Sequence, residues 1–102
     1  MLNLQLDVKP NTEVRLRRLL SQMQDTEEFA QNIIAFRISE LRRGVLNLRI
    51  DLKRFEDQYQ MSSETFYNRF EQGQIEDAED NMLWAGLYEM YRENQQQLQD
   101  LQ

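Results

Sequence analysis

The chain has 102 residues and a formal net charge of -6, with 40% hydrophobic and 29% charged residues. It contains no cysteine and no histidine, which excludes disulfides and thiolate chemistry and removes the commonest general base and metal ligand. No apolar run approaches the ~18 residues of a membrane span, and no signal peptide is apparent, so we expect a cytoplasmic protein. A chain this short forms one small core, which favours self-association or a partner. We therefore expect no enzymatic activity, no cofactor, no metal and no small-molecule substrate.

The first expected element is a β-strand over residues 2–8, where apolar and polar side chains alternate strictly. Pro10 ends this strand, and Asn11 or Thr12 is a suitable cap for a helix that runs from about Thr12 to Met23. We therefore expect the chain to begin with a strand that is followed by helices.

A long second helix is predicted from Asp25 to Tyr59, because Asp25 and Glu28 have capping-box spacing and a regular apolar pattern follows. Apolar residues then recur at alternating intervals of four and three, the pattern of a helix packed lengthwise on another helix. Packing within the chain and a coiled coil between two chains both satisfy this pattern. The residues of the seam are Ile34, Ile38, Leu41, Val45, Leu48, Leu52, Phe55 and Tyr59.

Two features within the second helix would also fit an interruption of the helix near Gly44. Gly44 costs a helix about 1 kcal/mol relative to alanine, and residues 46–52 alternate in the manner of the first strand. The two stretches read LNLQLDVK and LNLRIDLK. We favour a continuous helix, because the seam persists on both sides of Gly44.

Two shorter helices are expected in the rear of the chain. Ser62 or Ser63 can cap a helix that ends at Glu71, and Gly73 is the expected C-terminal stop. An acidic connector covers residues 74–80, and the last helix runs from about Asn81 to Leu101. The acid spacing in the connector fits no calcium loop, which favours a solvated segment over a metal site.

Charge divides the chain into two parts at Arg54. Residues 1–54 hold ten basic and seven acidic side chains, a net charge of +3, whereas residues 55–102 hold two basic and eleven acidic side chains, a net charge of -9. Cationic surface attracts nucleic acid, and anionic surface repels it and attracts basic proteins. The division predicts a front part for dimerisation and possible DNA binding, and an acidic rear part that binds a partner.

The strand, helix, helix order of residues 2 to about 43 resembles the ribbon-helix-helix family, in which strands from two subunits form a DNA-binding ribbon. This resemblance implies a mainly α fold with a short N-terminal β-strand, a long second helix and a helical C-terminal extension. It also implies a homodimer that pairs through the strand. The candidate residues of the dimer seam are Leu2, Leu4 and Leu6 of the strand and, from the spacing of threes and fours in the second helix, Ile34, Ile38, Leu41, Val45, Leu48 and Leu52. The implied DNA-binding residues are Asn3, Gln5, Lys9, Arg15 and Arg18.

Some residues depart from the ribbon-helix-helix pattern. Asn3 and Gln5 suit adenine, but Asp7 would repel phosphate at a position where the family usually has a cationic or hydroxyl residue. Asp25, Glu27 and Glu28 oppose an anion at the start of the second helix, where the family grips phosphate. These departures weaken the DNA-binding expectation more than the fold expectation.

The segment from Phe55 to Tyr91 resembles the C-terminal region of a group of small bacterial antitoxins. Those proteins carry a run similar to YGMSSEEFYRRF, an acidic turn with glycine and a run similar to EWAxLYEMY. Here the matching stretches read YQMSSETFYNRF and LWAGLYEMY, with Gln60 in place of the usual glycine. The resemblance implies a type II antitoxin, in which the acidic part covers a basic toxin and the front part represses the operator.

Several aromatic residues in this rear part are candidate partner-binding residues: Phe66, Tyr67, Phe70, Trp84, Tyr88 and Tyr91. The alternative for these side chains is an internal core, which helical spacing favours. The alternative for the whole protein is a homo-oligomeric helical scaffold or adaptor with neither a DNA nor a toxin partner.

Overall fold

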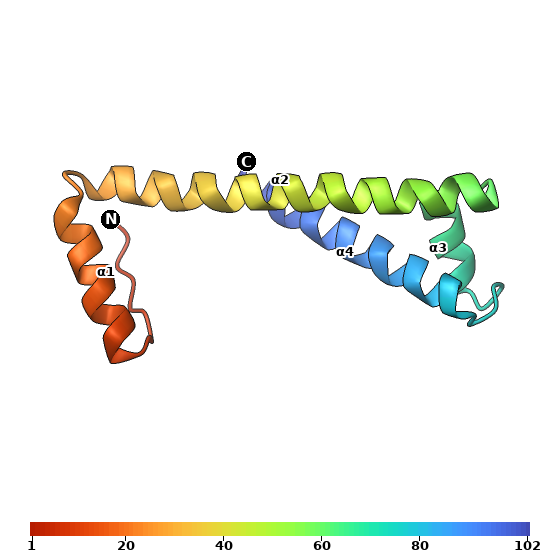
Figure 1. Ribbon diagram of the computed structural model, residues 1–102, viewed down its shortest axis with the longest axis horizontal. Coiled ribbons are helices and arrows are strands. Elements are labelled where there is room, and N and C mark those ends of the chain that lie inside the picture. Colours follow the sequence, from red (N-terminus) through yellow and green to blue (C-terminus); the bar gives the residue numbers. More distant parts are fainter. The chain divides into compact units, whose positions relative to one another are not determined.

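The computed structural model describes all 102 residues and contains four α-helices and no β-strand (Figure 1). The helices are α1 (Pro10–Gln22), α2 (Thr26–Tyr59), α3 (Ser63–Glu71) and α4 (Glu79–Leu101). The chain forms two compact units, Met1–Ala35 and Phe36–Gln102, which are described separately. No helix combines the length and the apolarity that crossing a membrane requires.

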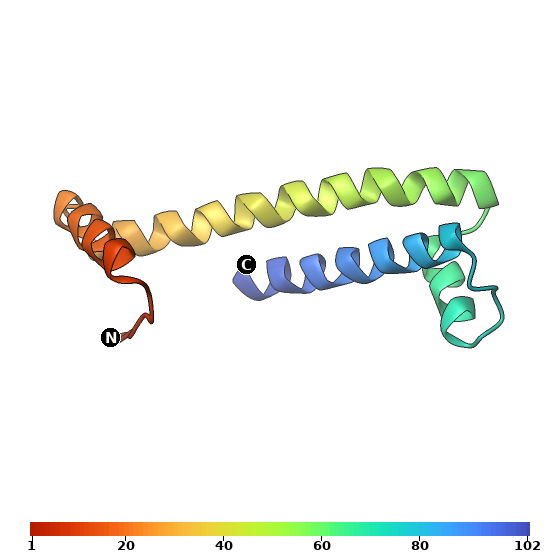
Figure 2. The same cartoon turned by 60° about the horizontal axis from the view of Figure 1, so that its bottom comes forward.

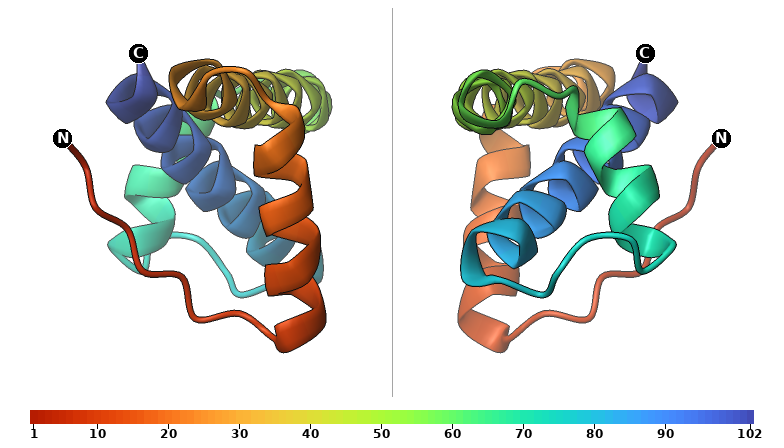
Figure 3. Two further views of the ribbon diagram at one scale, coloured as in Figure 1. Left: turned by 90° about the vertical axis from the view of Figure 1, so that its left-hand side faces the viewer. Right: turned by 90° about the vertical axis from the view of Figure 1, so that its right-hand side faces the viewer.

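The predicted N-terminal strand and the ribbon-helix-helix fold are wrong for this chain. Residues 1–9 are extended but carry no strand pairing, and Figure 3 draws them as a plain coil. A strand needs a neighbour to bond its N–H and C=O groups, and the only similar stretch, residues 46–52, lies inside α2. Leu2, Leu4 and Leu6 are consequently exposed to solvent, by 65% to 80%.

The unit Met1–Ala35 contains α1 and the first turns of α2. Helix α1 begins two residues before the predicted start, because Pro10 occupies its first turn, where the missing N–H costs nothing. Arg17 pairs with Glu13 one turn away at 3.0 Å. No residue of this unit is buried, although Val14, Leu19 and Leu20 follow a helical apolar spacing. The unit therefore has apolar side chains but no core of its own.

Helix α2 confirms the prediction of one continuous helix through Gly44. Asp25 caps its N-terminus by accepting the Glu27 N–H at 3.0 Å through Oδ1. Gly44 lies where α4 comes close, since a Cβ added there would stand 2.9 Å from Nδ2 of Asn94. The absence of a side chain at Gly44 thus permits the approach of two helices and does not break α2.

In the unit Phe36–Gln102, α4 runs back along the second half of α2 (Figures 1 and 2). Four contacts define this antiparallel register. Arg37 donates to Gln97 at 2.8 Å, Gly44 faces Asn94, the Arg49 guanidinium lies 5.9 Å from the Tyr91 ring centre, and Tyr59 donates to Asp80 at 3.2 Å. The heptad seam of α2 is therefore covered within the chain over residues 41–52, where Leu41, Leu48 and Leu52 are buried.

Two tight turns join the helices of this unit. Gln60 follows α2 with a left-handed φ of 52°, and Met61 N–H donates to the Glu56 carbonyl at 3.3 Å. Gly73 follows α3 with a φ of 73°, as predicted, and Gln74 N–H donates to the Arg69 carbonyl at 2.9 Å. These backbone bonds satisfy carbonyls at each helix end.

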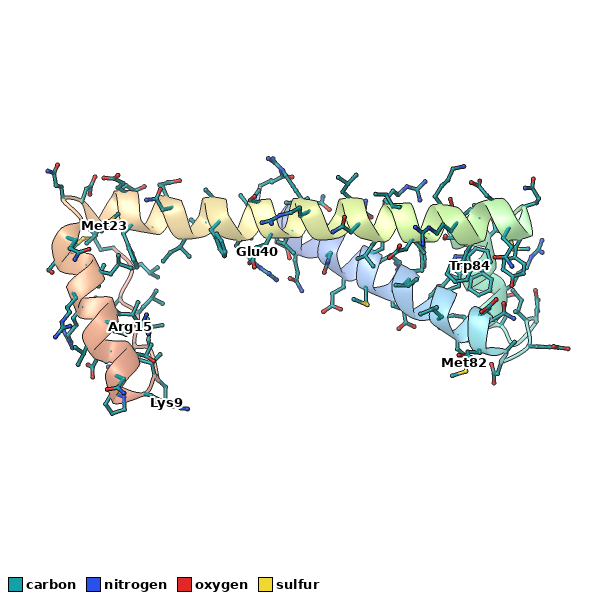
Figure 4. The ribbon with its side chains drawn as sticks, in the orientation of Figure 1. Lys9, Arg15, Met23, Glu40, Met82 and Trp84 are labelled. Atoms are coloured by element: carbon teal, nitrogen blue, oxygen red, sulfur yellow. The ribbon has the colours of Figure 1, made fainter.

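The core of the unit lies where α2, α3 and α4 meet. Trp84 and Phe66 stack with ring centres 3.8 Å apart, and Leu52 is completely buried beside them. Figure 4 shows Trp84 directed between the helices. Tyr67 and Ala85 complete the buried cluster, with Phe55, Met61, Phe70, Ile75, Leu87, Tyr88 and Tyr91 partly buried around it.

Candidate protein-binding surface

A buried polar network fixes the N-terminus of α3 on α2 and α4. Ser62 caps α3 by accepting the Thr65 N–H at 3.1 Å. The Trp84 Nε1–H donates to the Ser63 hydroxyl at 2.9 Å, and the Ser63 N–H donates to the Glu56 carboxylate at 3.0 Å. Arg49 lies 3.5 Å from the same carboxylate. Three helices are thereby joined by groups that leave no buried side-chain polar atom unpaired.

The Glu56 carboxyl is ionised more readily than an ordinary glutamate. Its partial burial opposes ionisation, but hydrogen bonds from the Ser63 hydroxyl and N–H, together with the Arg49 charge, outweigh that effect and lower its pKa. The side chain therefore acts as a fixed anion at the start of α3, where the helix dipole also favours negative charge.

A second polar contact joins α3 to α4. Tyr67 donates to the Glu89 carboxylate at 2.7 Å, and this hydrogen bond, with burial, raises the pKa of Tyr67 to about 12. The Arg92 guanidinium lies 5.9 Å from the Tyr67 ring centre and 5.8 Å from that of Tyr88. Arg92 thus stabilises aromatic rings and forms no ion pair.

The outside of this scaffold is strongly acidic. Residues 55–102 carry eleven carboxylates, of which Glu56 is half-buried and the other ten are exposed. Only Glu56 and Asp57 pair with a cation of the chain, so nine carboxylates remain without a basic partner. We call the ten exposed carboxylates the acidic surface: Asp57, Glu64, Glu71, Glu76, Asp77, Glu79, Asp80, Glu89, Glu93 and Asp100.

The acidic surface contains no arrangement suited to metal binding. No group of three or more acidic, cysteine or histidine side chains is placed to hold an ion. An open cleft of about 420 Å³ lies between α2, α3 and α4, lined in part by Arg49, Glu56, Tyr88, Tyr91 and Arg92. Arg49, Glu56 and Arg92 in this cleft already contact one another or aromatic rings, whereas Glu64, which also lines it, has no cation partner.

The candidate partner-binding aromatics divide into inner and outer residues. Phe66, Tyr67 and Trp84 are buried, and Phe70, Tyr88 and Tyr91 are half-buried around them. The burial of the first three favours their alternative assignment as core residues. The remaining three are partly buried and pack against the core from its boundary.

The candidate DNA-binding residues all lie in the unit Met1–Ala35 and are exposed. Asn3 and Gln5 belong to the unpaired N-terminal segment, and Lys9 is the N-cap of α1. Arg15, labelled in Figure 4, and Arg18 are exposed residues of α1. Arg15 and Arg18 line a shallow depression of about 500 Å³ on α1. Without a ribbon, no element aligns Asn3 and Gln5 for reading bases.

The candidate dimer seam is only partly free. Leu41, Leu48 and Leu52 are buried within the chain, and Ile38 and Val45 are half-buried. Leu2, Leu4, Leu6 and Ile34 remain exposed. Where α4 covers the seam, the contact is between helices of one chain.

Sequence reasoning missed the network of Arg49, Glu56 and Ser63. Ser63 was expected only as a helix cap, whereas Ser62 caps α3 and Ser63 faces Trp84. The two neighbouring serines before the predicted helix were a partial signal of this network, because a helix cap needs only one hydroxyl and leaves the other for a different contact.

In comparisons with protein-family models, with curated proteins and with solved structures, no match to this chain was found.

Proposed function

We propose that this chain is an antitoxin-like protein that binds a small basic protein through the acidic surface and blocks its toxic activity. The observation that carries the proposal is the set of nine carboxylates in residues 55–102 that have no cation partner in the chain. Such a surface raises the encounter rate with a cationic protein and disfavours anionic partners.

The packing beneath the acidic surface supports this function. Apart from Asp57 at the end of α2, these carboxylates belong to helices α3 and α4 and to the connector between them, and these elements are fixed by the core around Trp84. Preorganised charges bind at a smaller cost in conformational entropy than charges on a disordered tail. Exposed apolar side chains among the acids, including Tyr59, Met82 and Leu83, offer anchors for an interface.

The class of partner comes from the resemblance to antitoxins in the stretches YQMSSETFYNRF and LWAGLYEMY. These stretches cover the end of α2, the turn after it, most of α3 and the first half of α4, and they supply several core residues of the unit Phe36–Gln102. Repression of an operator is not included in the proposal. That expectation depended on a two-stranded ribbon, and the chain has no strand.

A homo-oligomeric scaffold with no toxin partner is the second candidate. It is favoured by the unit Met1–Ala35, whose apolar side chains, including Leu2, Leu4 and Ile33, are exposed and lack a core. Covering them by other copies would stabilise the unit by roughly 25 cal/mol per Å² of apolar area.

Expression of an adjacent short gene for a basic protein tests the first candidate. We expect that gene product to arrest growth alone and to be harmless when this chain is co-expressed. Neutralising Glu76, Asp77, Glu79 and Asp80 together to their amides should weaken protection, because four steering charges are lost.

The matched control neutralises Asp7, Glu13, Glu27 and Glu28, four acids of the other unit, and should protect like the wild type. Absence of a neighbouring basic gene product, or equal protection by both variants, contradicts the proposal.

A further inference from the structure

Helix α4 has an outward face that nothing in the chain covers. Leu83 is 54% exposed and Met90 is 53% exposed, and their spacing of seven residues puts them on one side of the helix. Gly86 lies between them on this side, and Glu79 and Glu93 stand at its two ends without a cation partner. We call these five residues the α4 outer face.

Helix α2 has a comparable outward face of opposite charge. Leu46 is 60% exposed and Ile50 is 51% exposed, one turn apart. Arg43 precedes them and Arg54 follows them at helical spacing, and neither forms an ion pair in the chain. We call these four residues the α2 outer face. Both outer faces belong to the unit Phe36–Gln102.

Gly86 is the second sign that the α4 outer face receives another helix. A glycine inside a helix is destabilising relative to alanine and is usually retained for a close approach. At Gly44 that approach is visible within the chain, because an added Cβ would stand 2.9 Å from Asn94. An added Cβ at Gly86 would meet nothing within 4 Å. No contact inside the chain therefore requires Gly86.

We infer that the α4 outer face of one copy binds the α2 outer face of a second copy of this chain. Each face has two apolar side chains between charged ends, and the ends are anionic on α4 and cationic on α2. In this contact, Leu46 or Ile50 of the second copy packs on the backbone at Gly86, where no side chain intervenes. The carboxylates of Glu79 and Glu93 then form ion pairs with Arg43 and Arg54 of the second copy. Charge complementarity selects this pairing over contacts between like faces.

This contact is independent of the proposed function, since it joins two copies and needs no basic protein. Failure of toxin neutralisation would not contradict this contact between copies. A monomeric chain would not contradict the proposed function. The two ideas are thus tested by different measurements, namely growth protection and the oligomeric state of the purified chain.

A charge-exchange experiment on the full chain tests the contact. One variant carries Arg43→Glu and Arg54→Glu, and the other carries Glu79→Lys and Glu93→Lys. Sedimentation velocity at low salt should show association of the wild type and a monomer for each variant alone, because both faces of a variant then have the same charge sign. Mixing the two variants should restore association, since each supplies the face that the other lacks.

Three results would overturn the inference: a monomeric wild type, a variant that associates alone as the wild type does, or a mixture that stays monomeric. Misfolding cannot imitate the expected result, because two unfolded variants would not complement each other. Circular dichroism of each variant checks the helices directly.

Gly86→Ala provides an independent test, because it should raise the stability of the chain and weaken its self-association. The substitution should raise the urea midpoint of the chain, because alanine favours the helix and meets no atom. It should weaken association several-fold, because the added methyl group separates the two helices. Unchanged association of Gly86→Ala would overturn the close approach at this position.

Discussion

At the scale of single residues, Ser63 is the centre of the C-terminal unit. It is 2% exposed, and its hydroxyl is the acceptor for the only tryptophan of the chain. Its backbone N–H also donates to the carboxylate of Glu56, which Arg49 contacts from α2. Three helices therefore depend on hydrogen bonds that meet at one small side chain.

Ser63→Ala should destabilise the chain by about 1–3 kcal/mol, because the Trp84 N–H would remain buried without an acceptor. Urea denaturation followed by tryptophan fluorescence measures this loss. Ser39→Ala, at an exposed position of α2, is the control and should change stability by less than about 0.5 kcal/mol. Equal stability of both variants would show that the Ser63 hydroxyl is dispensable.

The lowered pKa of Glu56 predicts a dependence of stability on pH. A carboxyl that ionises more readily when folded contributes stability above its unfolded pKa, and that contribution disappears as the pH falls through the folded pKa. Glu56→Gln should therefore be less stable than the wild type at neutral pH and should approach it in acid. Urea midpoints at pH 7 and pH 3 measure the difference, and a constant gap between the two proteins would refute the assignment.

At the scale of elements, the helices could be predicted from the sequence because their signals are local. Apolar spacing of three and four residues, Asp25 and Ser62 as caps, and Gly73 as a stop act within one or two turns. The absence of pairing in residues 2–8 could not be predicted from local signals. Alternation over residues 2–8 and over residues 46–52 looks the same, yet Leu48 and Leu52 pack inward from a helix while residues 2–8 find no pairing partner.

The turn between α2 and α3 stores conformational strain. Gln60 adopts a left-handed φ of 52°, which costs a residue with a Cβ about 1 kcal/mol and costs glycine nothing. Gln60→Gly should therefore raise stability by about 1 kcal/mol, less the small contribution of the exposed hydrogen bond from Gln60 to the Asp57 carbonyl.

The matched control for this turn is Gln58→Gly, two residues earlier within α2. There glycine should lower stability by about 1 kcal/mol, because the backbone is helical. Thermal unfolding by circular dichroism compares the two variants. Midpoints that move in the same direction would show that Gln60 is not strained.

At the scale of the whole molecule, charge organises what the chain can bind. The division at Arg54 that the sequence suggests falls inside α2, whereas the compact units meet between Ala35 and Phe36. Charge and packing therefore divide the chain differently. The acidic balance of the rear part could be predicted by counting residues. The burial of Phe66 and Trp84 could not, because it depends on contacts between residues far apart in the chain.

The two proposed contacts use some of the same groups. Glu79 and Glu93 belong to the acidic surface and also to the α4 outer face. A basic protein on α4 would therefore displace a second copy, and we expect the oligomer to dissociate as a basic partner is added.

The central claim is that the acidic surface binds a basic protein, and a calorimetric titration at several salt concentrations tests it most directly. The full chain is titrated with the basic product of the adjacent gene. Steering and pairing by exposed carboxylates predict 1:1 binding whose affinity falls steadily as salt rises and falls further in the variant neutralised at Glu76, Asp77, Glu79 and Asp80. Absence of binding, or an affinity that neither salt nor this variant changes, would contradict the claim.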